Sequence, residues 1–285
     1  MNATEIAQYP MMRVRRTVRG FASGWNRVGD QIAFHADTVR AIRDSLVNYR
    51  KETVRLVAAM SLGTGALAMI GGTIVIVGFL TLSAGALVAV QGYNLLAGIG
   101  TEALTGFVSA YINVRILAPL VSGIGMAATI GAGATAQLGA MRINEEIDAL
   151  EVIGVRSIAY LASTRLVAGV LVVGPLYAIG VWMSFFAARF GTTYIYGQSV
   201  GVYDHYFYTF LNPSDLLWSF FSAVMMAIVV MLVHTYYGFT ASGGPAGVGE
   251  AVGRAVRTSL IAVVIVTLMI SLSIYGQSGN FHLSG

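Results

Sequence analysis

Long apolar stretches separated by short polar segments make up almost all of the chain after residue 55. A bilayer core about 30 Å thick takes roughly 20 apolar helical residues, and these stretches reach that length. The pattern predicts an all-α polytopic membrane protein, in which an N-terminal interfacial or elbow helix precedes five transmembrane helices. The expected spans lie at about 56–90, 103–140, 157–188, 216–237 and 255–275.

The first stretch is too long for one straight helix across a bilayer. Residues 56–90 would extend about 50 Å as a helix, and several glycines near its start offer places to break it. We expect an elbow or re-entrant piece followed by one span. Two further segments are expected as loops, the Tyr- and Phe-rich residues 190–214 and the Gly-rich residues 238–254.

Residues 31–55 place apolar side chains at spacings of three, four and seven, with basic side chains elsewhere around the helix. This pattern is typical of an amphipathic interfacial helix. A cytosolic helix packed on a partner protein is the alternative. The apolar positions are Ile32, Val39, Ile42, Leu46 and Tyr49.

Composition and charge agree with a membrane protein. Hydrophobic residues make up 56% of the 285 residues, charged residues 11%, and the mean hydropathy is +0.73; soluble domains carry about 25% charged residues. Most Lys and Arg residues lie before Leu56, which predicts a basic cytoplasmic segment at residues 1–30 and an extracytoplasmic C-terminus. Because a membrane-surface helix explains these basic residues, no nucleic-acid partner is expected.

A short acidic segment separates the second and third expected spans. Asn144 can cap a helix there and Gly154 can end it, which predicts a short cytoplasmic helix able to hold a soluble partner. A solvated connecting loop is the alternative. The acids are Glu145, Glu146, Asp148 and Glu151. The apolar anchors of such a helix are Ile143, Ile147, Leu150 and Ile153.

A stripe of small residues recurs every four positions in the second span. Small side chains let two helix backbones approach closely in lipid. The stripe therefore predicts a helix contact, either within the chain or across a dimer. Its members are Gly123, Ala127, Gly131, Thr135 and Gly139.

Arg115 is the most prominent charge inside a span. A guanidinium in the bilayer usually faces a cavity or a partner, although structural pairing or snorkelling to the surface is equally open here. Arg165 lies nearer the inner surface, where snorkelling suffices. His234 is expected to be a packed or interfacial side chain rather than a ligand.

Catalytic and metal chemistry find no support in the spacing of residues. Without cysteine there is no disulfide or thiolate metal site. Lys51 follows Arg50 rather than glycine, so a Walker A loop is absent and any ATP is hydrolysed by another chain. Residues 247–253 have one residue too many for a dinucleotide fingerprint, and Asp204–His205 lacks a nucleophile motif. We expect a non-enzyme with no catalytic residue, metal or cofactor of its own.

Two long motifs resemble the signatures of the MlaE/YrbE permease family. They are residues 131–154, which contain the acidic segment, and residues 238–257. The outer segments 196–199, 203–207 and 209–211 look most like the B-type YrbE subunit of an Mce lipid-import system. The resemblance covers the chain from about Gln31 onward, with residues 56–285 as an MlaE-like permease domain.

This resemblance implies the membrane subunit of an ABC transporter in the bacterial plasma membrane. It implies an elbow helix and five spans, a heterodimer with an A-type YrbE permease, a cytosolic ABC ATPase that binds ATP and Mg, and extracytoplasmic Mce proteins. Hydrophobic lipids would be carried, whether fatty or mycolic acids, sterols or phospholipids. The alternative is a scaffold subunit that anchors the tunnel and the ATPase while its partner permease handles substrate.

The resemblance also assigns residues. Arg115, Gln91 and Tyr93 match the family's lipid pocket or its outer side, and the ATPase-coupling helix would hold Glu145, Glu146, Asp148, Leu150 and Glu151. Two departures stand out. The acid that follows the arginine in many members is missing after Arg115, and Gln137 stands where others carry Glu. An unbalanced Arg115 would suit a lipid that bears a carboxylate.

Overall fold

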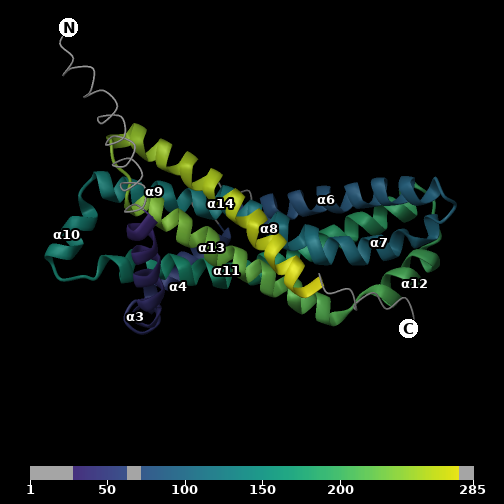
Figure 1. Ribbon diagram of the computed structural model, residues 1–285, viewed down its shortest axis with the longest axis horizontal. Helices are drawn as coiled ribbons and strands as arrows, with labels where there is room; N and C mark the ends of the chain where they lie inside the picture. Colours follow the sequence, from purple (N-terminus) through teal and green to yellow (C-terminus); the bar gives the residue numbers. More distant parts are fainter. Residues whose placement is uncertain (1–27, 63–71, 276–285) are drawn as a thin grey trace, which may run out of the picture.

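The structure, a computed structural model, describes residues 28–62 and 72–275 (Figure 1). Apart from short turns and connections, these residues are helical and no strand is present among them. The long helices lie roughly side by side along the long axis, with α10 (Glu146–Val152) at one end and α12 (Val200–Phe210) at the other. The prediction of an all-α membrane protein is confirmed.

Five helical stretches in the described residues are long and apolar enough to cross a membrane, as predicted. They comprise α6 (Gly72–Ala97), a second span built from α7 (Thr105–Ile112), α8 (Ala118–Met126) and α9 (Ala132–Ile143), α11 (Thr164–Phe190), α13 (Pro213–Phe239) and α14 (Gly244–Tyr275). Within the described residues the first span covers Gly72–Ala97. Residues 63–71, where an elbow or re-entrant piece was expected to turn, lie outside the described residues.

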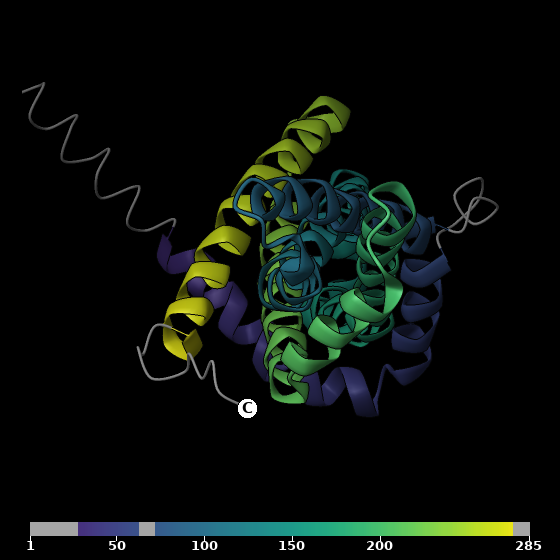
Figure 2. The same ribbon diagram turned by 90° about the vertical axis from the view of Figure 1, so that its right-hand side faces the viewer.

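The N-terminal helix is broken into pieces, so the expectation of one helix over residues 31–55 is wrong. Residues 28–40, α3 (Ile42–Val47) and α4 (Arg50–Leu62) are separate helices. The buried Ser163 hydroxyl donates to the carbonyl of Thr38 at 2.7 Å, which ties the first piece to the bundle. Seen from the α12 end, these helices pass around the bundle rather than along it (Figure 2).

Short π-helical segments lie within the second span and at both ends of the third. One of them, η2 (Asn113–Leu117), directly precedes Pro119 at the start of α8. Proline has no amide hydrogen to donate to the preceding turn, and a local widening re-registers the hydrogen bonds. The other segments are η3 (Ala127–Gly131), η4 (Ile158–Ser163) and η5 (Gly191–Ile195).

The outer segment expected as a loop at residues 190–214 is largely helical, so that prediction is wrong. α12 packs on α7, where a Cβ on Gly106 would lie 2.3 Å from the carbonyl oxygen of Tyr203. The buried Tyr203 hydroxyl donates to Ser109 Oγ at 2.8 Å. Arg189 pairs with Asp204 at 2.8 Å and joins α12 to the end of α11. The aromatic residues recur at helical spacing because one face of α12 is buried.

The Gly-rich segment expected as a loop at residues 238–254 is also mostly helix. α14 begins at Gly244 and is continuous through Tyr275. Ala251 and Ala255 are fully buried, and Val248 packs on Gly139 of α9. Packing against α9 therefore outweighs the weak helix propensity of the glycines.

Candidate functional site

The short helix α10 stands at the end of the bundle between the second and third spans (Figure 1). Ile147 is fully buried against Leu138 and Leu161, and Leu150 packs against this cluster. A helix of two turns has little stability of its own. The buried Ile147 is what holds it on the bundle.

The start and end of α10 differ from the prediction. Asn144 ends α9 instead of capping α10, and Glu145 precedes α10 with a left-handed backbone at φ 59°. Among the described residues Glu145 is the one non-glycine with positive φ. Such a conformation costs about 1 kcal/mol and turns the chain sharply out of α9. Gly154 follows the helix with φ 81°, as its predicted role as terminator requires.

The exposed face of α10 combines acids with apolar side chains. Asp148 is held by Arg142 at 2.5 Å, whereas Glu145 and Glu146 form no ion pair within the described residues. Glu151 accepts a short hydrogen bond from the Ser157 hydroxyl. Ile153, which was expected to anchor the helix, instead faces outward at 74% exposure, and the neighbouring Val152 is 87% exposed.

Arg115 is paired, which corrects the expectation that its balancing acid is missing. Its Nε and Nη2 donate to the same carboxylate oxygen of Asp215 at 3.0 and 2.8 Å. The guanidinium also lies 4.0 Å from the ring centroid of Tyr111. Both charged side chains are about 15% exposed. Arg115 therefore joins the second span to the start of α13.

Gln91 and Tyr93 lie near the C-terminal end of α6, which packs on η5, whereas Arg115 lies within η2 of the second span. Gln91 is exposed, and Tyr93 stacks on Tyr196 with ring centroids 4.3 Å apart. Asn94 donates to the Tyr196 hydroxyl at 3.4 Å. The three residues assigned to a lipid pocket therefore make separate contacts, Arg115 with α13 and Tyr93 with Tyr196 at the end of η5, and do not contact one another.

The small-residue stripe packs within the chain, on α13 and α14. A Cβ at Gly123 would lie 2.9 Å from Met226 Sδ, and one at Gly139 would lie 2.9 Å from Val248. Ala127 is fully buried. The intrachain alternative is therefore the one that the structure supports for this stripe.

Gly131 and Thr135 enclose His234 at the middle of the stripe. Thr135 Oγ1 lies 2.7 Å from His234 Nδ1, and Ser259 Oγ lies 3.1 Å from Nε2. His234 has no exposed surface. The prediction of a packed histidine is confirmed, and this histidine links three spans through hydrogen bonds.

Arg165 is buried at 4% exposure, so the expectation that it snorkels to the surface is wrong. Its Nη1 donates to the Leu161 carbonyl at 3.0 Å, and its Nη2 lies 3.5 Å from Gln137 Oε1. Nε has no hydrogen-bond partner among the described residues.

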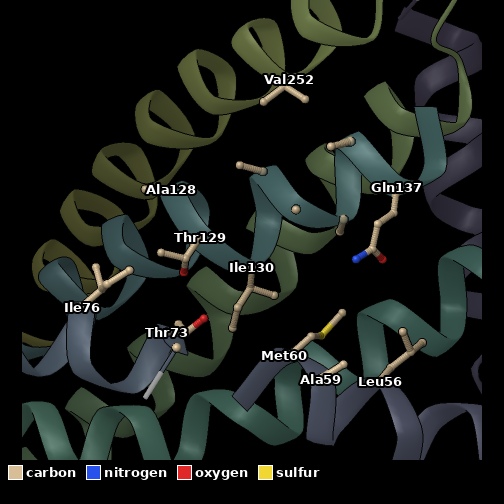
Figure 3. A pocket seen from close by; sticks show the side chains of 15 residues that line it. Leu56, Ala59, Met60, Thr73, Ile76, Ala128, Thr129, Ile130, Gln137 and Val252 are labelled. Atoms are coloured by element: carbon tan, nitrogen blue, oxygen red, sulfur yellow. The ribbon is translucent and has the colours of Figure 1, made fainter. Parts of the chain in front are cut away.

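A cavity of about 540 Å³ lies between α4, α6 and α9, and Gln137, which contacts this arginine, is one of the residues that line it (Figure 3). Its wall is mostly apolar, and Gln137 is one of its few polar side chains. No hydrophobic period in the sequence singles out this cavity, because its lining comes from segments distant in the chain. Residues that line it include Leu56, Met60, Thr73, Ile76, Ile130 and Gln137.

Comparison with known proteins gives a consistent result. The family model described as permease MlaE matches residues 62–273. A probable ABC transporter permease protein of Rickettsia bellii is 26% identical over 196 residues, which is 69% of this chain and 76% of that protein. A probable ABC transporter permease protein of Synechocystis sp. is 25% identical over 184 residues, 65% of this chain and 70% of that protein.

A plant protein is also similar. The protein TRIGALACTOSYLDIACYLGLYCEROL 1, chloroplastic, of Arabidopsis thaliana is 25% identical over 191 residues. The alignment takes in 67% of this chain and 55% of the plant protein, so the chain spans about half the length of that relative. No group of three or more possible metal ligands occurs in the described ranges 28–62 and 72–275.

Proposed function

The chain belongs to the MlaE permease family of ABC transporters, and we propose that it is a membrane subunit of an Mce-type lipid transporter. In this proposal a separate cytosolic ATPase binds ATP and Mg and drives the subunit through α10. Hydrophobic lipids pass between the extracytoplasmic Mce proteins and the plasma membrane of a bacterium. The name of the Arabidopsis relative, which is that of a glycerolipid, supports lipid as the class of substrate.

The observation that carries the proposal is the construction of α10. Ile147 anchors the helix without exposed surface, while Val152, Ile153 and the acids Glu145 and Glu146 face outward. A rigidly held helix end with apolar and acidic side chains is suited to a groove lined by basic residues. Force applied to α10 reaches the second and third spans directly, because it connects them with short turns.

The charge distribution supports placing α10 in the cytoplasm. The bases near the α10 end greatly outnumber those near α12, where Arg189 is paired with Asp204. Basic residues are retained on the cytoplasmic side of membrane proteins. On this orientation the C-terminal end of α14 faces outward. The bases concerned are Arg142, Arg156, Arg254 and Arg257.

We propose that a second permease subunit pairs with this chain through α14. Only 17% of the most apolar window of α14 is buried in the structure, against 39–50% for the other four spans. α14 crosses obliquely in front of the other helices in Figure 1 and lies to their left in Figure 2. Its uncovered side supports pairing with a partner subunit, which we propose to be an A-type YrbE permease on the likeness of the outer segments to the B-type.

Charge reversal on α10 tests the ATPase contact. In the double variant Glu145→Lys, Glu146→Lys we expect loss of at least about tenfold of co-purified ATPase, because a few charged contacts at an interface contribute this much. Asp148 is left unchanged because reversing it would repel Arg142. The matched control is Asp30→Lys, an exposed acid outside α10 that, like Glu145 and Glu146, forms no ion pair within the described residues. Equal ATPase recovery from the α10 variant and the control would refute the role of α10.

A further inference from the structure

The cavity between α4, α6 and α9 lies in the half of the bundle nearer α10, distant from Arg115. Its volume of about 540 Å³ falls within the range of small-ligand sites, about 300–1,000 Å³. Leu56 and Met60 of α4 face Ile76 of α6 and Ile130 across it (Figure 3). An apolar wall of this kind accepts a hydrocarbon chain.

Gln137 places a polar amide on one side of the cavity. Gln137 reaches from α9 toward Met60 and Leu56 in the close view (Figure 3), and its residue is exposed. Behind it, Arg165 Nη2 contacts the Gln137 amide oxygen at only 3.5 Å, which is beyond an ordinary hydrogen bond. Gln137 lines the cavity and Arg165 does not, so the Arg165 guanidinium lies one side chain away from the cavity.

The Nε–Nη2 edge of Arg165 has a hydrogen-bond donor without an acceptor among the described residues. Nη1 is satisfied by the Leu161 carbonyl, but the buried Nε has no partner among the described residues. Nε and Nη2 form the edge of a guanidinium that binds a carboxylate or phosphate with two parallel hydrogen bonds. A buried cation with one good neutral hydrogen bond is unfavourable, so a site for an anion is implied.

The protein itself does not supply that anion in the described residues. Glu52 of α4 is the acid whose charge acts most on Arg165, but both its carboxylate oxygens accept from Arg55 at 2.6 and 2.8 Å. Arg55 adds a positive charge on the same side. Gln137 offers a neutral amide, which does not balance a guanidinium.

We propose that this cavity binds an anionic lipid. Its acyl chain lies along Leu56, Met60 and Ile76, and its carboxylate or phosphate takes the Nε–Nη2 edge of Arg165 after Gln137 swings aside. The inference goes beyond the proposed function, since such a lipid can be held here whether or not it is transported. It therefore stands or falls separately from ATPase coupling at α10.

Photo-labelling tests the site directly. The full chain in phosphatidylcholine nanodiscs is labelled with a diazirine-bearing C16 fatty acid or with the fatty alcohol of the same length, and labelled peptides are mapped. We expect labelling of residues 56–60 and 128–137 to be about tenfold greater for the acid, equivalent to about 1.4 kcal/mol. Equal labelling by acid and alcohol, or labels confined to other spans, would overturn the proposal.

Competition identifies the source of the anion. Phosphatidylglycerol is expected to reduce labelling of these segments, whereas added phosphatidylcholine, inorganic phosphate and acetate are expected to leave it unchanged. Equal displacement by inorganic phosphate would show a site for small anions and overturn the assignment to a lipid.

Gln137→Glu provides the sharpest variant, because it adds a carboxylate next to Arg165 with almost no change of shape. In this variant we expect the fatty acid and the fatty alcohol to label the cavity segments about equally. Asn94→Asp, the same amide-to-acid change at the far end of α6, serves as control and should keep the preference. A preference unchanged by Gln137→Glu in a folded protein would contradict the role of Arg165. Filling the cavity with Gly133→Leu, where no atom lies within 4 Å of an added Cβ, should remove both labels.

Discussion

Replacing Gly131 with alanine would place a methyl group against the His234 ring. An added Cβ would lie 2.5 Å from Cδ2 and 2.7 Å from Nε2, distances that atoms do not adopt without movement. The ring has no easy retreat, because Thr135 holds Nδ1 at 2.7 Å and Ser259 holds Nε2 at 3.1 Å. The clash can therefore be relieved only if the second span moves away from α13 or if these hydrogen bonds break.

The size of the effect follows from opposing contributions. Overpacking of a buried site costs about 1–3 kcal/mol, and a lost buried hydrogen bond adds about 1 kcal/mol. The gain in helix propensity from glycine to alanine returns up to about 1 kcal/mol. We expect Gly131→Ala to lower the free energy of unfolding by about 2 kcal/mol. Gly133→Ala, two residues along the same span and without neighbours within 4 Å, should have no penalty.

Thermal unfolding of detergent-purified protein, followed by size-exclusion fluorescence, measures the difference between the two variants as a shift in Tm. The double variant Gly131→Ala, His234→Ala isolates the cause. If the ring is the obstacle, the alanine at 131 should cost little once the ring is removed. Equal stability of Gly131→Ala and Gly133→Ala, or the same penalty with and without the His234 ring, would refute the steric explanation.

Three further predictions concern other polar contacts. Asp215→Asn should lower Tm, with a loss of about 1–3 kcal/mol, because the charged partner of the largely buried Arg115 is removed; an unchanged Tm would contradict this. Burial lowers the pKa of His35 below 6.5, so its contribution to stability is full above that pH and is lost as the pH falls toward the folded-state pKa. Tm should drop more between pH 7.5 and 5 in the parent than in His35→Phe. The same drop in Tm for both proteins would contradict a role for His35 in this pH dependence. Tyr203→Phe removes a buried hydrogen bond, so it should destabilise α12 by about 1 kcal/mol and speed its amide hydrogen exchange. An unchanged exchange rate would contradict a stabilising role for this hydroxyl.

The spans could be predicted from the sequence because their signal is local. A run of about 20 apolar residues identifies a helix in lipid without knowledge of its neighbours. The acidic segment was placed correctly between the second and third spans for the same reason, although its exact start at Glu146 was not. The segments that were wrongly predicted as loops depend on contacts with distant parts of the chain. α12 and the first turns of α14 are helices because Tyr203 and Ala251 are buried against other helices.

The candidate site shows the same limit more sharply. Asp215, the partner of Arg115, is 100 residues away in the chain, and nothing near Arg115 indicates it. The sequence singled out Gln137 as a departure from the family and Arg165 as a charge near the inner surface, but nothing in it related the two residues. Their proximity at 3.5 Å, and the unpaired Nε, emerge only when α9 and α11 are packed together.

The two arginines within the bundle differ in what their Nε–Nη2 edges contact. In Arg115 the Nε–Nη2 edge is already occupied by a carboxylate of the chain, so an incoming anion would have to displace Asp215. In Arg165 the same edge meets only a neutral amide on an exposed, movable side chain. An anion gains most where no internal charge competes. Arg115 is therefore suited to hold α13 against the second span, and Arg165 to receive a lipid headgroup. Exchanging these roles should be possible in part: Asp215→Asn together with Gln137→Glu should lower acid labelling near residues 56–60 and raise it around Arg115. Unchanged positions of labelling would show that the pairing state of these arginines does not direct where an anionic lipid binds.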